Sequence, residues 1–280
     1  MRLPRRSAFR SKRRVGQYVA AALVSLVFVF PFLVMLSTAF KPESEIFSSP
    51  PALLPGTWTL ANFRDALAAI PFWRYLFNTV LIAGLSMVGT ALVCPMVAYS
   101  LAKVRWRGAR VIFMLILGTM VLPPQVTMIP LYLIWDGVGA VGTIVPLIAP
   151  SFLGVPFFIF LVRQFLVSVS DSLIEAGRID GASEFRIYWE IVLPIARPAV
   201  VTAAVFQFMW AWTDFVNPLI YLNRPENRTL SIGLYSFFGE NTVAWGPLMA
   251  ASVLFTVPAV LVFLIGQRFF IGGISAGAIK

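Results

Sequence analysis

Six long runs with almost no charged residues dominate this sequence of 280 residues. A helix needs about 20 mostly apolar residues to cross the hydrocarbon core of a bilayer. Backbone groups in lipid must be satisfied within their own segment, and the alternation typical of β-barrel strands is absent, so we predict helices. The runs are residues 15–40, 75–102, 111–135, 137–162, 199–222 (interrupted only by Asp214) and 241–267. They predict an all-α, polytopic membrane protein with six transmembrane helices.

Composition supports this class and excludes several others. The chain is 59% hydrophobic and 12% charged, whereas soluble proteins have about 45–50% and about 25%. Its net charge of +10 lies in short basic runs between the apolar segments, which indicates membrane topology rather than nucleic-acid binding. There is no His, and Cys94 is the single Cys, so His-based catalysis, His metal ligation and an internal disulfide are excluded. We expect no catalytic residue, no metal and no bound cofactor.

The distribution of basic residues predicts the orientation. Most of the 22 lie in residues 1–14, 103–110, 163–197 and 268–280. Both termini are therefore expected in the cytoplasm, with 1–14 as a basic cytoplasmic tail and 15–280 as the transmembrane domain. The first run has a basic start like a signal peptide, but it exceeds the usual apolar core of about 7–15 residues, which favours an uncleaved span. The expected location is the plasma membrane of a bacterial-type cell.

The cytoplasmic loop at about residues 163–197 is the most polar part of the chain, with five of its 12 acidic residues. Ser172 followed by Glu175 fits a capping box, which predicts a short helix ending at Ile179. Gly181 then allows the left-handed conformation that ends helices. The loop should be an exposed and structured surface.

A second short helix is expected after this turn. Ser183 can cap it, and Pro194 and Pro198 are expected to stop it near Ile191. Aromatic residues with helical spacing give it an aromatic face: Phe185, Tyr188 and Trp189. From the residues alone, two functions stay open for the loop. It could be an amphipathic connector resting on lipid headgroups, or it could dock a partner.

The string EAGRIDGASEFRIYWEIVLP resembles the EAA loop of permease subunits of ATP-binding-cassette importers. The family pattern is Glu-Ala-Ala, three residues, Gly, nine residues, Ile, one residue and Leu-Pro. This chain departs from it at Gly177, which replaces the second Ala and should lower local helix stability by up to about 1 kcal/mol. The resemblance implies ATPase coupling for nine residues: Glu175, Ala176, Gly177, Asp180, Gly181, Ala182, Ile191, Leu193 and Pro194.

The rest of the chain resembles the carbohydrate-uptake branch of this family, of the maltose and glycerol-phosphate type. The matching strings include STAFKPESEIF, AYSLAKVRWRG, LPPQVTMIPLYLI, WTDFVNPLIYL and FFIGGISAGAIK. The resemblance implies the type I importer fold, a second homologous permease subunit, a cytoplasmic ATPase dimer that binds ATP and Mg, and an extracytoplasmic solute-binding protein. It also implies that residues 275–280 can reach the ATPase dimer. The chain itself has no G-x-x-x-x-G-K-[ST] phosphate loop, so a partner must hydrolyse ATP.

Four residues in the spans are candidates for the translocation path. Asp214 is the one acid well inside a span, where charge is costly and usually faces the bundle interior. Trp212 and Asn217 lie near it in the sequence, and Asn78 begins the second span. The alternatives are a paired acid at a helix end for Asp214, and a hydrogen bond between helices for Asn78.

Two other classes of function are weighed. A self-sufficient carrier or channel needs ion-coupling residues in the spans, and only Asp214 offers itself. A membrane-embedded enzyme needs a cluster of polar catalytic residues, which the lack of His argues against. The sequence does not name the solute, since glycerol phosphates, disaccharides and oligosaccharides are all carried by such permeases.

Overall fold

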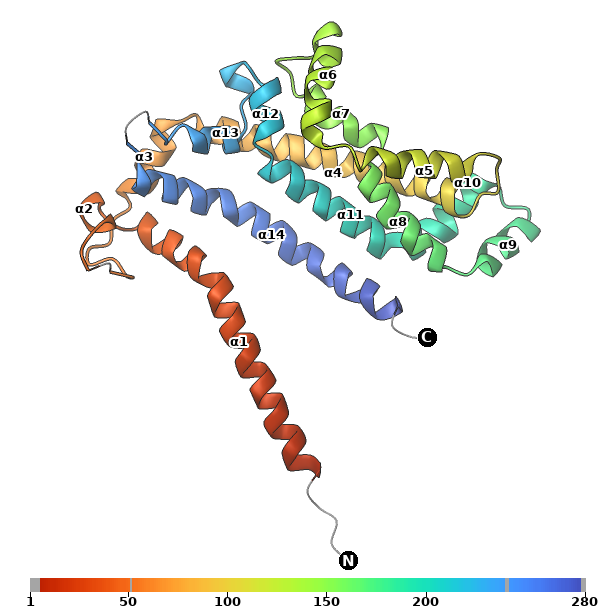
Figure 1. Ribbon diagram of the computed structural model, residues 1–280, viewed down its shortest axis with the longest axis horizontal. Helices are drawn as coiled ribbons and strands as arrows, with labels where there is room; N and C mark the ends of the chain where they lie inside the picture. Colours follow the sequence, from red (N-terminus) through yellow and green to blue (C-terminus); the bar gives the residue numbers. More distant parts are fainter. Residues whose placement is uncertain (1–5, 51, 240–241, 278–280) are drawn as a thin grey trace, which may run out of the picture. The chain divides into compact units, whose positions relative to one another are not determined.

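The computed structural model describes residues 6–50, 52–239 and 242–277, with side chains from 16 to 269 outside the two inner gaps, and this part of the chain is helical, with no β-strand. It divides into two compact units, whose helices are labelled in Figure 1. Unit 1 comprises Met1–Ile70 and Phe237–Leu254, and unit 2 comprises Pro71–Ser236 and Phe255–Lys280.

Unit 1 contains α1 (Arg6–Ala39), α2 (Glu43–Ile46), α3 (Ala61–Ala69) and the first turns of α14 (Trp245–Gly277). The buried amide of Asn62 on α3 donates hydrogen bonds to the carbonyls of Ala39 at 3.0 Å and Lys41 at 2.7 Å. These bonds satisfy carbonyls left free where α1 ends. The most apolar stretch of α1 has no buried residue in the structure, as expected for a helix whose solvent is lipid.

Unit 2 is built around α4 (Phe72–Ala102) and α11 (Leu193–Thr213). Both helices bury small residues at intervals of three or four along one face, which lets their backbones approach closely without a hydrophobic drive between helices in lipid. On α4 these are Ala83, Ser86, Thr90, Cys94 and Ala98, and on α11 they are Ala196, Ala199 and Ala203.

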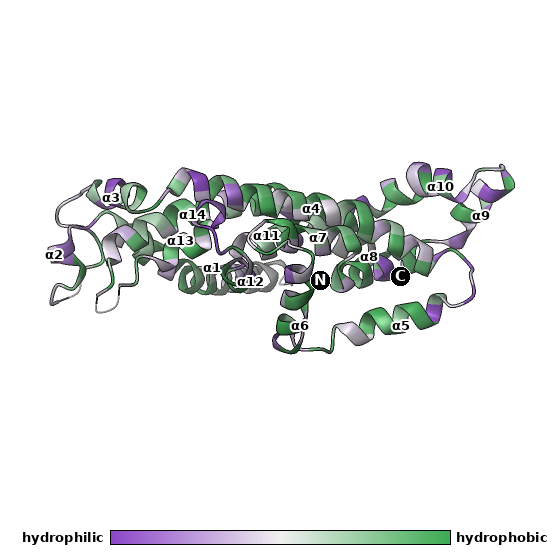
Figure 2. Cartoon of the chain, turned by 90° about the horizontal axis from the view of Figure 1, so that it is seen from above, coloured by the Kyte–Doolittle hydropathy of each residue, from purple (hydrophilic) through white to green (hydrophobic). Residues whose placement is uncertain are grey.

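The remaining helices of unit 2 pack beside or extend from this pair. They are α5 (Ala109–Thr119), α6 (Pro124–Gly137), α7 (Val145–Leu153), α8 (Pro156–Ser168), α9 (Asp171–Ile179), α10 (Glu184–Ile187), α12 (Val216–Tyr221), α13 (Leu230–Tyr235) and the part of α14 from Phe255 onward. A π-helix, η1 (Tyr188–Val192), joins α10 to α11, and a short 3-10 helix, η2 (Pro225–Asn227), precedes α13. Figure 2 shows hydrophobic residues along α4, α11 and α5, with hydrophilic residues gathered on α9 and α10.

The expected spans are confirmed in number but not in shape. In the described residues, five helices are long and apolar enough to cross a membrane, and α5 with α6 makes a sixth if the bent pair is one span. The axes of α5 and α6 differ by 102°, because Pro123 and Pro124 interrupt the third span. The fourth span is broken at Gly154, between α7 and α8.

One boundary differs from the prediction. The fifth span was expected at 199–222, but its helix runs from Glu184 to Thr213 and stops before Asp214. Helix α1 begins at Arg6, and its candidate span, Gly16–Ala39, agrees with the first predicted run. The cytoplasmic location of both termini stays a prediction, and residues 1–5 and 278–280 lie outside the described residues.

Candidate functional site: the clamped helical loop

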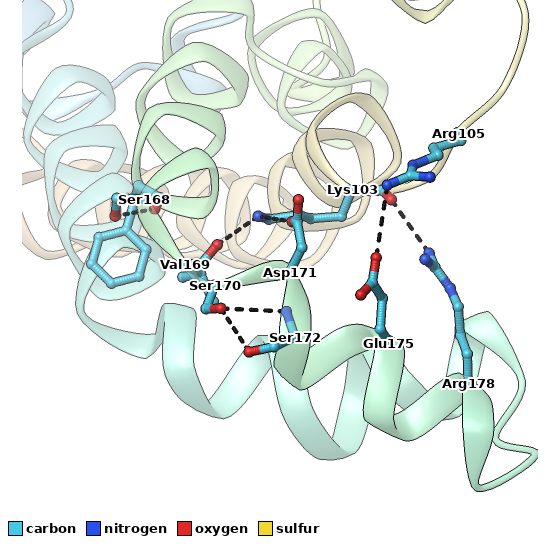
Figure 3. Close-up of polar contacts among 10 residues, drawn as sticks. Lys103, Arg105, Ser168, Val169, Ser170, Asp171, Ser172, Glu175 and Arg178 are labelled. Atoms are coloured by element: carbon cyan, nitrogen blue, oxygen red, sulfur yellow. Dashed lines mark hydrogen bonds and ion pairs between the residues drawn. The ribbon is translucent and has the colours of Figure 1, made fainter.

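The polar loop folds as two short helices at one end of unit 2. The first, α9, has Ser170 as its N-cap, whose hydroxyl accepts a hydrogen bond from the Ser172 backbone N–H at 3.3 Å. The expected capping box from Ser172 to Glu175 is therefore wrong, because the N-cap lies two residues earlier. Glu175 instead lies 3.7 Å from the guanidinium of Arg105 (Figure 3). Both of these side chains are more than half exposed, so this pair contributes little stability.

A buried lysine anchors the start of α9. The ammonium of Lys103, just after α4, donates to the carbonyl of Val169 and to the carboxylate of Asp171, each at 2.6 Å (Figure 3). The Lys103 side chain is only 5% exposed, so both bonds compensate for removing its charge from water. Lys103 also holds the pKa of Asp171 below its usual value. The loop is thus attached to the end of α4.

The turn between the two helices is the one expected. Gly181 has φ +77°, a left-handed conformation that residues other than glycine adopt at a cost of roughly 1–2 kcal/mol. The Ala182 N–H donates to the Gly177 carbonyl and the Gly181 N–H to the Arg178 carbonyl, each at 3.0 Å. This is a Schellman motif. Ser183 then caps α10 by accepting from the Arg186 N–H at 3.3 Å, as predicted.

The second helix does not stop at Pro194, and that prediction is wrong. The chain passes through η1 directly into α11, which keeps Pro194 in its first turn and Pro198 in its interior. In the π-segment the Leu193 N–H bonds to the Tyr188 carbonyl, five residues earlier. This longer bond widens the turn by one residue. The wider turn accommodates Pro194, which has no backbone N–H to donate. The loop is therefore rigidly continuous with the fifth span.

A second clamp joins the two short helices to each other and to α4. Arg178 on α9 donates to the carboxylate of Glu184 on α10 at 2.7 Å, and its guanidinium also reaches the Lys103 carbonyl at 3.3 Å. The hydroxyl of Tyr99 on α4 donates to the other oxygen of Glu184 at 2.6 Å. Hydrogen bonding to Glu184 raises the pKa of Arg178 above its ordinary value. Sequence reasoning missed Tyr99, Lys103 and Arg178 in these roles, because the bonds that tie them to one another and to the loop mostly join residues that are far apart in the sequence.

The nine predicted loop residues divide between two sides of the loop. Glu175, Ala176, Asp180, Gly181 and Pro194 are exposed, whereas Gly177 is buried and Ala182, Ile191 and Leu193 are partly buried against the core of unit 2. Of the expected aromatic face, Tyr188 is buried beside Tyr99, while Phe185 and Trp189 stay exposed. With Ile179, which is 85% exposed, they leave an apolar outer surface on the loop.

The departure at Gly177 has a packing reason. A Cβ at this position would lie 3.0 Å from Cδ1 of Ile191 and 3.3 Å from Cγ1 of Ile187. The glycine lets α9 approach the start of the fifth span more closely than an alanine would.

Substituting Gly177 with alanine tests this explanation. The gain in helix propensity, about 1 kcal/mol, opposes the cost of overpacking, roughly 1–3 kcal/mol. We therefore expect a small net loss in the free energy of unfolding, measured by thermal denaturation of the purified chain in detergent. The double variant with Ile191→Val should recover that loss, and a loss that persists there would contradict the packing explanation.

Two of the four candidates for the translocation path are in structural positions. Trp212 is 1% exposed and stacks between Phe208 and Phe255, and its indole N–H donates to the Phe255 carbonyl at 3.1 Å. Asn78 is buried, and its amide donates to the carbonyls of Glu226 and Arg228, each at 2.9 Å. Asn78 therefore holds the segment before α13 against α4, a structural role that differs from the expected hydrogen bond between helices in that its acceptors lie in η2 and the turn after it.

Asp214 and Asn217 lie together where α11 ends. The two oxygens of Asp214 accept from the backbone N–H of Asn217 at 3.2 Å and from its side-chain amide at 2.8 Å. Both residues line a cavity of about 640 Å³ in unit 2. Residues that could ligate a metal form no cluster of three anywhere in the described chain.

A multi-pass helical bundle that carries a clamped polar loop fits the class of membrane permease subunits. A family model for the inner membrane component of binding-protein-dependent transport systems matches residues 91–275, and the chain belongs to this family. It is a non-catalytic subunit of an ATP-binding-cassette importer, whose ATPase activity is in partner subunits. The family also implies a solute-binding protein and a second permease as partners.

Individual relatives align along nearly the whole chain. The diacetylchitobiose uptake system permease protein DasC of Streptomyces coelicolor is 31% identical, over 95% of this chain and 97% of its own. A probable starch degradation products permease, AmyC of Thermoanaerobacterium thermosulfurigenes, is 32% identical, over 96% and 99%. A chain of a bacterial transporter involved in the import of alginate has a TM-score of 0.81 at 23% identity, covering 96% of this chain and 100% of that one. The structural likeness shows the importer permease fold.

Proposed function

We propose that this chain is the permease of an importer for a sugar or sugar-like solute, and that residues 163–197 form its coupling surface for a cytoplasmic ATPase dimer. The observation that supports coupling is the double clamp on the loop. Lys103 ties the start of α9 to the end of α4, and Glu184 ties α10 both to α9 and to Tyr99. A loop held at two points can transmit a force applied to its outer surface.

The direction of transmission follows from the helical connections. Helix α10 continues through η1 into α11, so displacement of the loop is passed directly to the fifth span. The Tyr99 bond passes it to the second span as well. Alternating access requires an element whose equilibrium the nucleotide can bias. Closure of an ATPase dimer that holds Ile179, Phe185 and Trp189 in its cleft would provide that bias, because these apolar side chains are exposed.

The sugar class is supported by the relatives, whose printed names concern diacetylchitobiose and starch degradation products. Delivery by a solute-binding protein accords with the family description. A second permease subunit is part of the proposal, since the apolar α1 and the cavity in unit 2 both offer surfaces that a neighbouring subunit in the membrane can cover.

The coupling proposal is tested at the outer turn of the loop. We expect Gly181→Val to abolish most ATP-driven uptake in proteoliposomes containing the assembled importer, while ATP hydrolysis persists. The physical reason is the left-handed φ, which a β-branched residue adopts at a cost of about 1–2 kcal/mol, so the turn must change shape. Gly181→Asn should keep most of the uptake, since asparagine tolerates this conformation.

A matched pair of glutamates controls for charge. Glu175→Gln on the proposed docking surface should lower uptake, and Glu226→Gln in η2 should leave it unchanged. Membrane levels of each variant are compared by immunoblot. Uptake at the wild-type rate in both Gly181→Val and Glu175→Gln, with normal membrane levels, would contradict coupling through this loop.

A further inference from the structure

A cavity of about 640 Å³ lies among the helices of unit 2. Its lining comes from α4, α6, α7, α11 and α12. The break in the fourth span at Gly154–Val155, between α7 and α8, and the end of the fifth span at Asp214, after α11, both line it. Irregular backbone at membrane depth is tolerated where it is buried in protein or lines a polar cavity. In other transporters, interrupted helices are also where substrates bind.

One polar side chain in this lining lacks a partner. Gln207 on α11 is 8% exposed, and its amide oxygen has no hydrogen-bond partner among the described residues. A buried acceptor without a donor is unfavourable, and most such groups in proteins are satisfied. The terminal torsion of glutamine is soft. The amide can therefore turn its oxygen or its N–H₂ group toward a ligand in the cavity at little cost.

The other lining residues indicate the chemistry of that ligand. Three aromatic side chains, Trp135, Trp210 and Tyr221, provide apolar faces with polar edges. Asp214 and Asn217 add a carboxylate and an amide, and no Lys or Arg is among the lining residues of the described chain. An anionic ligand would meet the Asp214 carboxylate without a compensating cation. A neutral ligand with many hydroxyl groups and an apolar face fits all of these features.

We propose that this chain itself contacts the solute, through a subsite for an uncharged sugar ring in which Gln207 accepts or donates a hydrogen bond and Asp214 excludes acidic sugars. This rests on the proposed function, because the ligand is taken to be the transported solute. It goes beyond that function in assigning a solute-binding site to this subunit. It also replaces Trp212 with Trp210, whose indole lines the cavity.

Photolabelling of the intact complex, purified from membranes by a tag on this chain, tests the subsite. The probes are diazirine derivatives of glucose-, xylose- and galactose-based trisaccharides. We expect labelling of peptides containing residues 131–155 or 207–221. Unlabelled neutral trisaccharides should compete and trigalacturonate should not. Gln207→Met should reduce labelling by about fivefold, the effect of one lost neutral hydrogen bond.

Matched variants separate binding from folding. Gln164→Met makes the same change at an exposed position of α8 and should leave labelling unchanged. Gln207→Met removes an unpartnered acceptor, so its melting temperature should be equal to or above that of the wild type. Asp214→Asn should let trigalacturonate compete, whereas Asp136→Asn, at an exposed residue outside the cavity lining, should not.

Label found only on the partner permease, no label at all, or full labelling of Gln207→Met would each overturn the subsite. ATP-driven uptake of the same neutral sugars is measured separately in proteoliposomes. Uptake with label confined to the partner subunit would reject this inference and leave the proposed function standing. Specific labelling here without any ATP-driven uptake would reject the proposed function instead.

Discussion

Replacing Trp212 with alanine is expected to lower the free energy of unfolding by about 3–5 kcal/mol, the cost of truncating a large buried aromatic residue. The indole is 1% exposed and lies 5.4 Å from the ring of Phe208 and 5.5 Å from that of Phe255. Truncation leaves a cavity between α11 and α14, and it leaves the Phe255 carbonyl without the indole N–H. Thermal and denaturant unfolding of the purified chain in detergent measure the loss.

Trp210 is the matched control, because it lies on the same helix and is 49% exposed. Trp210→Ala should lose less than half as much stability, since its ring is only partly surrounded, by Phe157 and Phe158. In the photolabelling experiment the ranking reverses, and Trp210→Ala should lose more label. Equal destabilisation by the two variants would show that the burial difference does not govern stability here.

Reversing the charge of Arg178 is expected to lower ATP-driven uptake about tenfold or more, which corresponds to about 1.4 kcal/mol of lost interaction. In Arg178→Glu, two carboxylates would replace an ion pair whose atoms are 2.7 Å apart. Glu184 would keep only its bond from Tyr99, and the Lys103 carbonyl would lose a donor. The link between α9 and α10 would open while the membrane spans stay intact. Uptake by proteoliposomes is compared with membrane insertion and ATP hydrolysis.

The loop also provides the control for this reversal. Arg186 pairs with Glu190 at 2.9 Å, four residues apart on one helical turn, and both side chains are at least 60% exposed. Exposed pairs of this kind contribute about 0.3–0.5 kcal/mol. Arg186→Glu should therefore change uptake by less than about threefold. The exchange of Arg178→Glu with Glu184→Arg should restore part of the uptake. If Arg186→Glu were as damaging as Arg178→Glu, general surface charge would explain the loss and the clamp would not.

Much of the architecture was accessible from local sequence features. The length of apolar runs is set by bilayer thickness, so the existence of the spans followed from counting residues. The turn at Gly181 and the cap at Ser183 were also predictable, because each depends on the conformational preference of one residue and on neighbours within four positions.

Errors arose where a distant contact outweighed a local preference. Ser170 rather than Ser172 caps α9, because Lys103 draws the Val169 carbonyl and Asp171 together and so sets where the helix starts. Pro194 was expected to end a helix. Instead the chain forms a π-turn, η1, which packs beside α4, and this turn accommodates Pro194 within a continuous helix.

The sequence by itself determined that this chain is a multi-span helical membrane protein with an exposed helical loop, since hydrophobic length and turn residues act locally. The assignment as a permease came from the resemblance of that loop to a known family. Only the tertiary structure decided which residues attach the loop to the membrane spans and which residues line the cavity. The clamp brings the Tyr99 hydroxyl and the Lys103 carbonyl, at the end of α4, against Glu184 and Arg178 of the loop, and these groups meet only when α4 lies beside the loop. The tertiary structure also places Trp212 in the core and Gln207 in the lining of a cavity, although both residues lie on α11 and carry a polar group in the side chain. Helical spacing places a residue on a face, but only packing determines what that face meets.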